Sequence, residues 1–165
     1  MRRPALGSAL FFLLAPGVVA GLVPWLLTHW ETGPMPAALR VLGAVLIAGG
    51  LPVLAHAFLR FVTEGRGTPA PVSPTSRLVV GGLYRRMRNP MYVAVGAVIA
   101  GQALLLGRSV LGIYLAAFCA AVATFVHGYE EPALRARFGE EYEAYRRAVP
   151  AWRPRRRPWR ADHQG

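Results

Sequence analysis

The polar and apolar positions of this chain alternate in long blocks. Four apolar runs stand between short polar stretches, and arginines flank the second run on both sides. An α-helix rises about 1.5 Å per residue, so roughly 20 apolar residues suffice to cross the hydrocarbon core of a membrane. We therefore predict transmembrane helices over residues 5–27, 41–59, 90–107 and 109–126.

The first and last of these spans each raise a question of topology. Arg2 and Arg3 precede the first run, as they would in a secretory signal peptide. The run is longer than the apolar region of a signal peptide and further spans follow, so we favour a membrane helix. Only Gly107-Arg108-Ser109 separates the third and fourth runs, which predicts a tight antiparallel hairpin.

The distribution of arginine predicts the orientation. Residues 28–39 hold one acid and no arginine, whereas residues 60–88 hold six arginines and one acid. Basic loops stay on the cytoplasmic side of a membrane. We therefore expect both termini, the loop over residues 63–89 and a basic tail over residues 150–165 to be cytoplasmic.

The composition supports a membrane protein. Hydrophobic residues make up 54% of the 165 positions and charged residues 16%, below the roughly 25% of soluble domains. The predicted fold class is an all-α integral membrane protein with about four transmembrane helices, forming one domain over residues 1–165. All 19 basic residues are arginine in an Ala-, Gly- and Pro-rich chain, which is typical of a GC-rich genome and predicts a bacterial plasma membrane.

The net charge of +11 does not predict a nucleic-acid partner, because the arginines lie between and beyond the apolar runs. The spans themselves carry few polar groups. His56 is expected to hydrogen-bond a neighbouring helix, and Cys119 to be a small buried residue. No acidic pair lies inside a span, which disfavours transport. Gly17 and Gly21 form a GxxxG pattern that could mark close helix packing.

The segment from Leu83 to Tyr92 joins a cluster of arginines to the start of the third span. Asn89 is a favourable N-cap, and Pro90 suits the first helical position. Free N–H groups at this helix start, beside Arg88, would attract a carboxylate or phosphate. The alternative is a capped transmembrane helix with a basic flank.

Glu130 and Glu131 follow the fourth span. Adjacent carboxylates beside an anionic leaflet need a positive counterpart, which could be Arg85, Arg86 or Arg88, or a cationic or polyhydroxylated ligand. Alternatively, they begin a helix at Pro132, since acids favour a helix N-terminus. Leu134, Phe138, Tyr142, Tyr145 and Val149 then recur at helical spacing, which predicts an amphipathic helix over residues 132–149. It would lie on the membrane surface or across the helix ends.

The basic tail contains two tryptophans among five arginines between Trp152 and Arg160. This composition predicts anchoring to anionic membrane lipid. The glycine- and proline-rich stretch from Gly65 to Pro74 is expected to form an irregular, fairly stiff loop. The alternative is a plain linker.

Taken in order, these motifs resemble the integral membrane methyltransferases that include isoprenylcysteine carboxyl methyltransferase and phospholipid methyltransferases. The resemblance covers residues 65–154. It rests on Gly67-Thr68-Pro69, on Leu83-Tyr84-Arg85 leading to Arg88-Asn89-Pro90-Met91-Tyr92, on Glu130-Glu131, and on Phe138-Gly139 through Tyr142, Tyr145, Val149 and Pro150.

In that family an Arg-His-Pro-x-Tyr segment and paired glutamates bind S-adenosyl-L-methionine on the cytoplasmic side. The resemblance implies a cofactor site formed by Arg88, Asn89, Pro90, Tyr92, Glu130 and Glu131, with no metal. Asn89 stands where histidine is common. It can donate and accept hydrogen bonds but cannot titrate, which puts an acid–base role at this position in doubt.

His127 is the candidate general base, because it precedes the two glutamates by three and four residues. A carboxylate acceptor needs no base, whereas an ammonium must first lose a proton. The alternative is a histidine that merely marks the membrane boundary.

The predicted function is methyl transfer from S-adenosylmethionine to a lipidic acceptor carrying a carboxylate, thiol or amine. One alternative is a nicotinamide-dependent sterol or isoprenoid reductase, which shares a similar arginine-rich segment but has more helices. The other is a small membrane scaffold without enzymatic activity.

Overall fold

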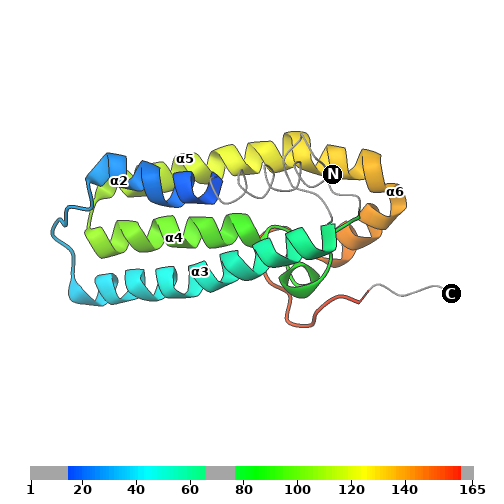
Figure 1. The fold of residues 1–165 in the computed structure, drawn as a ribbon, viewed down its shortest axis with the longest axis horizontal. Coiled ribbons are helices and arrows are strands. Elements are labelled where there is room, and N and C mark those ends of the chain that lie inside the picture. Colours follow the sequence, from blue (N-terminus) through cyan, green and yellow to red (C-terminus); the bar gives the residue numbers. More distant parts are fainter. Residues whose placement is uncertain (1–14, 66–76, 161–165) are drawn as a thin grey trace, which may run out of the picture.

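A computed structural model describes residues 15–65 and 77–160 of the chain, which form a long bundle of helices (Figure 1). Over this described part there is no β-strand, in agreement with the predicted all-α class. The elements are η1 (Val18–Leu22), α2 (Val23–Thr28), α3 (Ala37–Gly65), η2 (Gly82–Arg85), α4 (Pro90–Leu106), α5 (Ser109–Phe125), η3 (Val126–Glu130) and α6 (Glu131–Ala148).

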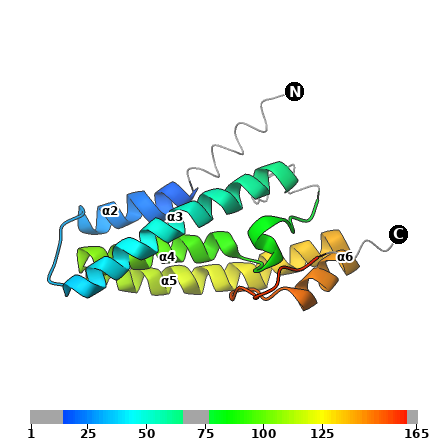
Figure 2. The same cartoon turned by 90° about the horizontal axis from the view of Figure 1, so that it is seen from below.

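The helices run side by side along the long axis (Figures 1 and 2). We call the end that holds residues 29–36 and 107–108 the loop end, and the end that holds residues 82–89 and 127–131 the basic end. The predicted hairpin is confirmed: Gly107 ends α4 in the left-handed conformation, with φ of 66°, and α5 begins at Ser109. Glycine favours this turn because it has no Cβ to clash there.

The helix boundaries lie close to the predicted spans. Helices α4 and α5 match the third and fourth spans within one residue, whereas α3 is longer than residues 41–59 and continues through Pro52 to Gly65. Two helices are long and apolar enough to cross a membrane, Ala37–Arg60 and Ser109–Ala148, and the described apolar helices Ala15–Thr28 and Pro90–Leu106 are shorter. Arg2, Arg3 and the rest of residues 1–14 lie outside the described residues, so the four-span count stays a prediction.

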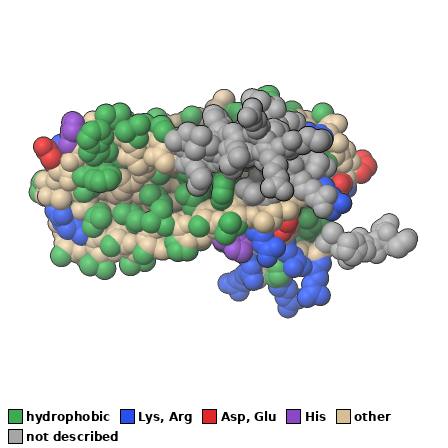
Figure 3. Space-filling model, viewed as in Figure 1, with side chains coloured by type: hydrophobic (Ala, Val, Ile, Leu, Met, Phe, Trp, Pro, Cys, Tyr) green, Lys and Arg blue, Asp and Glu red, His purple; other side chains and the backbone are tan. Residues whose placement is uncertain are grey.

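The surface of the bundle is apolar along its length. Leu51, Leu59 and Ile113 are all more than half exposed, and Figure 3 shows hydrophobic side chains between two charged ends. Cys119 is exposed as well, so the prediction that it is buried was wrong. In a helix that is apolar on every side, the sequence does not reveal which face packs on protein and which faces lipid.

Helices α3 and α4 pack closely through glycines. A Cβ added to Gly43 would lie 2.6 Å from the carbonyl oxygen of Gly101, and one added to Gly101 would lie 2.6 Å from that of Gly43. At Gly17 and Gly21 an added Cβ would meet nothing within 4 Å. The small-residue contact of this fold is therefore between α3 and α4, away from the GxxxG pattern of the first span.

The first helix contains the π-helical turn η1, whose carbonyl groups accept hydrogen bonds from other helices. Gln102 Nε2 donates to the Ala20 carbonyl at 2.7 Å, and the Tyr114 hydroxyl donates to the Val19 carbonyl at 2.7 Å. An unpaired carbonyl is costly in an apolar environment. These two hydrogen bonds therefore stabilise the packing of η1 against α4 and α5.

Helices α5 and α6 are continuous through the turn η3. The π-helical turn η3 joins α5 directly to α6, so Glu130 and Glu131 lie inside a long helix and do not begin a new one at Pro132. The predicted amphipathic helix over residues 132–149 exists as α6, but it kinks at Gly139, where φ is 51° and ψ is −124°.

The apolar stripe of α6 faces protein. Tyr142, Tyr145 and Val149 are buried together, and the partly buried side chains packed on them are Leu78, Val80, Leu134, Phe138, Ala148 and Trp159. This face of α6 therefore contacts the segment before α4 and the C-terminal segment.

Candidate functional site

The candidate site begins where α4 starts at the basic end. Asn89 occupies the N-cap position and Pro90 the first turn, as predicted, but the Asn89 side chain makes no capping hydrogen bond. Instead the Asn89 backbone N–H donates to the Ala151 carbonyl at 3.2 Å. Asn89 is buried, and its Nδ2 has no hydrogen-bond partner among the described residues. The prediction of a side-chain cap was therefore wrong, because the chain that returns after α6 holds this residue by its backbone.

Arg88 forms hydrogen bonds with three other residues of the site. Its Nη1 donates to Glu131 Oε1 at 2.5 Å and to the Tyr142 hydroxyl at 3.1 Å, and its Nε donates to the Val149 carbonyl at 3.0 Å. The Arg88 and Glu131 side chains are each only 12% exposed. Because breaking a buried pair leaves an uncompensated charge, either group alone would be costly at this position.

Glu130 lies next to this pair and contacts Tyr92. The Tyr92 hydroxyl donates to Glu130 Oε2 at 3.0 Å. The pKa of the Glu130 carboxyl is raised, mainly by burial and also by the negative charge of Glu131. The hydrogen bond from Tyr92 and the charge of Arg88 lower this pKa, but they do not cancel the rise. No salt bridge joins Glu130 to an arginine within the described parts of the chain, so its charge has only a neutral hydroxyl as direct partner.

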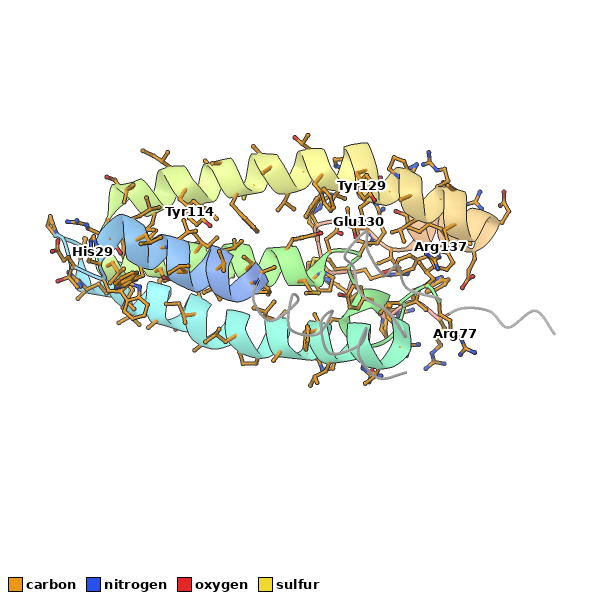
Figure 4. All side chains as sticks on the ribbon, turned by 45° about the horizontal axis from the view of Figure 1, so that its top comes forward. His29, Arg77, Tyr114, Tyr129, Glu130 and Arg137 are labelled. Atoms are coloured by element: carbon orange, nitrogen blue, oxygen red, sulfur yellow. The ribbon has the colours of Figure 1, made fainter. Side chains whose placement is uncertain are left out.

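The π-helical turn η3 presents the two glutamates to α4. Successive helical residues point in different directions, so Glu131 faces Arg88 while Glu130 faces Tyr92, the third residue of α4. Figure 4 shows Glu130 directed from the continuous helix α5–η3–α6 toward the other helices of the bundle. Single π-helical turns are frequent at functional sites, since they widen the helix and re-aim its side chains.

His127 contacts one of the two glutamates. Its Nδ1 lies 3.5 Å from Glu131 Oε2, and its side chain is 56% exposed. Its ring meets that of Trp152 edge to face, with centroids 6.4 Å apart. The predicted proximity to Glu131 is confirmed; no contact to Glu130 is found in the described residues.

The segment before α4 is fastened to α3. Glu64 Oε2 accepts a hydrogen bond from the Gly81 N–H at 2.8 Å, and Arg60 pairs with Glu64 at 2.9 Å. An added Cβ at Gly82, where φ is 54°, would lie 2.7 Å from His56 Nε2. His56 thus lies beside this turn, and in residues 15–65 and 77–160 it has no hydrogen-bond partner, so the predicted bond to a neighbouring helix is not seen. The motif Gly67-Thr68-Pro69 lies outside the described residues.

The C-terminal segment completes the site, which the sequence did not predict. Residues 150–159 run back along residues 85–89: Arg88 N–H donates to the Pro150 carbonyl at 3.0 Å, and Trp159 N–H donates to the Arg85 carbonyl at 2.8 Å. Arg85 and Arg86 turn toward this segment, donating to the carbonyls of Trp159 and Arg156. Of the arginines considered as partners for the glutamates, only Arg88 has that role in the described structure.

Two tyrosines of the α6 stripe support this arrangement. Tyr142 contacts Arg88 directly, and the buried Tyr145 hydroxyl donates to the Tyr84 carbonyl at 2.7 Å. Burial raises the pKa of Tyr145, so its hydroxyl keeps the proton that it donates. The sequence did indicate that both hydroxyls bond within the protein, because both tyrosines belong to the apolar stripe and a buried tyrosine hydroxyl usually needs a hydrogen-bond partner.

The group therefore combines one guanidinium, two carboxylates and an unpaired buried amide at the end of an apolar bundle. A guanidinium and an amide N–H suit a carboxylate ligand, and carboxylates suit a cation or hydroxyl groups. Among the described residues no cluster of three or more His, Cys, Asp or Glu could hold a metal ion.

Comparison with known protein families shows a match. The family model described as phospholipid methyltransferase matches residues 38–141, which include nearly all of α3, the whole of α4, α5 and η3, and Arg88 with both glutamates. Searches of curated proteins and of solved structures returned no match. Since the model spans most of the chain, and since the chain has long apolar helices, this is a membrane protein that belongs to the phospholipid methyltransferase family.

Proposed function

We propose that this protein transfers a methyl group from S-adenosyl-L-methionine to a lipidic acceptor at the cytoplasmic face of a bacterial plasma membrane. The observation that carries the proposal is the joining of Arg88 and Tyr92 to Glu131 and Glu130 at one end of an apolar bundle. The family match supplies the methyl-transfer chemistry.

The residues present suit this cofactor, which supplies an electrophilic methyl group on a sulfonium. Arg88 would hold its carboxylate at the start of α4, with the unpaired Asn89 Nδ2 as a further donor. Pro90 and Tyr92 shape the same helix start. Glu130 and Glu131 would face its cationic and hydroxyl groups, and a ligand cation would stabilise the Glu130 anion that burial disfavours.

The chain contributes mainly positioning. Arg88 is fixed by three partners and Glu130 by Tyr92, so a ligand meets preorganised groups and an acceptor can be aligned with little reorganisation. A carboxylate or thiolate acceptor needs no base. For an ammonium acceptor, His127 would take the proton, with Glu131 at 3.5 Å stabilising the resulting imidazolium.

The proposed topology is four spans with both ends in the cytoplasm. The arginines of residues 77–89 lie at the basic end, opposite Glu31 of the loop end, as the positive-inside rule favours. Arg40 and Arg108, at the loop end, are the exceptions. The acceptor would enter sideways from the bilayer, because the outer faces of α3 and α5 are apolar.

Calorimetry with S-adenosylmethionine on the detergent-purified chain tests the proposal. We expect saturable binding that weakens at least about tenfold in Glu130→Gln and in Glu131→Gln, since each removes a charged partner of the ligand. Glu140→Gln is the matched control, because the Glu140 side chain is 95% exposed on α6. Absence of binding by the unmodified chain, or binding of NADPH in its place, would contradict the proposal.

A second assay identifies the acceptor. Membrane lipid extract incubated with the protein and cofactor carrying a labelled methyl group should yield a labelled lipid. The product's sensitivity to mild base separates a methyl ester from an N-methyl or S-methyl product.

A further inference from the structure

The C-terminal segment carries an unbalanced positive charge. Residues 77–89 and 150–160 together hold nine arginines and no acid. Of these nine, Arg88 alone lies within 4 Å of a carboxylate in the part of the chain that the structure describes. Arg153, Arg156, Arg157 and Arg160 are exposed, and we call these four the arginine face. Figure 3 shows basic side chains gathered beneath the basic end.

The backbone holds the arginine face in place. Arg88 N–H and Asn89 N–H donate to the carbonyls of residues 150 and 151, while Arg155 N–H and Trp159 N–H donate to the carbonyls of residues 86 and 85, at 2.8–3.2 Å. A free tail could spread its charges apart. A segment bound to the protein at both of its ends cannot, so its repulsion must be relieved by solvent ions or by an anionic partner.

Each tryptophan of the segment has a ring contact with the protein. The Trp159 ring lies 5.4 Å from that of Tyr145, and the Trp152 ring lies 6.4 Å from that of His127. Both residues are partly buried. Insertion of these aromatic rings into a bilayer would break those contacts, so attachment of this segment to a membrane would come from the guanidinium groups.

With α4 as a membrane span, the arginine face would lie at the depth of the lipid headgroups. Its backbone partners, residues 85–89, directly precede α4, and α4 is apolar from Met91 onward. A guanidinium donates paired hydrogen bonds that match the phosphate group, and anionic lipids concentrate in the cytoplasmic leaflet that attracts such clusters. We propose that the arginine face binds the headgroups of anionic phospholipids in the surrounding membrane. This requires a membrane-spanning chain but not the proposed methyl transfer.

Tryptophan quenching by brominated lipid tests the proposal on the full chain. In a Trp25→Phe/Trp30→Phe background, fluorescence comes only from Trp152 and Trp159. The vesicles mix phosphatidylcholine with brominated phosphatidylglycerol. From the quenching we expect the ratio of phosphatidylglycerol to phosphatidylcholine next to the protein to be about tenfold higher than in the vesicle as a whole. The enrichment should fall toward unity at about 1 M salt, where the Debye length is about 3 Å.

Two charge-matched variants assign the effect. Arg156→Gln/Arg157→Gln should lower the enrichment at least about threefold, whereas Arg137→Gln/Arg147→Gln, which removes two exposed charges from α6, should leave it unchanged. Lipid retention counted by native mass spectrometry in the unmodified tryptophan background should give the same order. Equal enrichment in both variants, no enrichment at all, or preferential binding of single-stranded RNA over vesicles would overturn the proposal.

Discussion

The two ends of the bundle each centre on one partly buried arginine, but the partners differ. At the loop end Arg40 donates to three backbone carbonyls, those of Gly33, Met35 and Leu105. At the basic end Arg88 contacts a carboxylate, a hydroxyl and one carbonyl. Arg40 thereby closes a loop onto the C-terminus of α4, where a cation is favourable.

The difference separates a structural arginine from one suited to a ligand. Backbone carbonyls stay where the fold places them, so the three hydrogen-bond partners of Arg40 are fixed. A carboxylate can exchange its arginine for a ligand group, and Glu130 next to Arg88 has no salt bridge of its own to another described residue. The same residue type therefore serves stability at one end and, in our proposal, binding at the other.

The largest expected effect comes from substituting both arginines by lysine. Lysine keeps the charge but loses the planar array of donors. Arg88→Lys should weaken S-adenosylmethionine binding by about 30-fold, because one ammonium cannot hold Glu131 and the ligand together. Arg40→Lys should lower the free energy of unfolding by about 1–2 kcal/mol and leave binding unchanged. Calorimetry and thermal unfolding measure the two. Equal loss of binding in both variants would abolish the distinction between the ends.

An intermediate effect should follow from removing one hydroxyl at each end. Tyr92→Phe deletes the hydrogen bond that lowers the pKa of Glu130, so that pKa should rise further. Binding of a cationic ligand needs the Glu130 anion and is lost as pH falls through this pKa; the loss should therefore begin at a higher pH in the variant. Affinity measured from about pH 5 to 9 shows the shift.

Tyr114→Phe is the matched control, since the Tyr114 hydroxyl donates to the Val19 carbonyl inside the bundle. It should cost about 1 kcal/mol of stability without moving the pH profile. A profile that shifts equally in both variants would mean that Tyr92 acts through the fold and not through Glu130.

The smallest effect is expected at the exposed pair of the loop end. Arg108 lies 3.5 Å from Glu31, and their side chains are 37% and 69% exposed. Because water screens such pairs, Glu31→Gln should change the free energy of unfolding by less than about 0.5 kcal/mol and leave ligand binding unaltered. A loss of several kcal/mol would show that the loop end depends on ion pairing as the basic end does.

The grouping of Arg88 with Glu131 could be anticipated from charge alone, because two adjacent carboxylates needed a positive partner. The pairing of Tyr92 with Glu130 could not, since nothing in the spacing specifies which glutamate a π-helical turn directs to which side chain. The apolar stripe indicated that Tyr142 is buried with a hydroxyl in need of a partner, but it did not identify Arg88 as that partner. The return of residues 150–159 along residues 85–89 left no sequence signal, because backbone groups and arginine side chains bonded to backbone carbonyls make it, and carbonyls are present at every position.

The sequence by itself determined the helices, the hairpin at Gly107 and the concentration of arginine at one end, because long apolar runs and turn residues act locally. It also carried the ordered motifs that led to the family. Only the tertiary structure decided which faces pack, through Gly43 and Gly101, and how the C-terminal segment completes the site. Those outcomes depend on contacts between residues far apart in the chain, and in a membrane-type sequence apolar residues cover lipid-facing and buried surfaces alike.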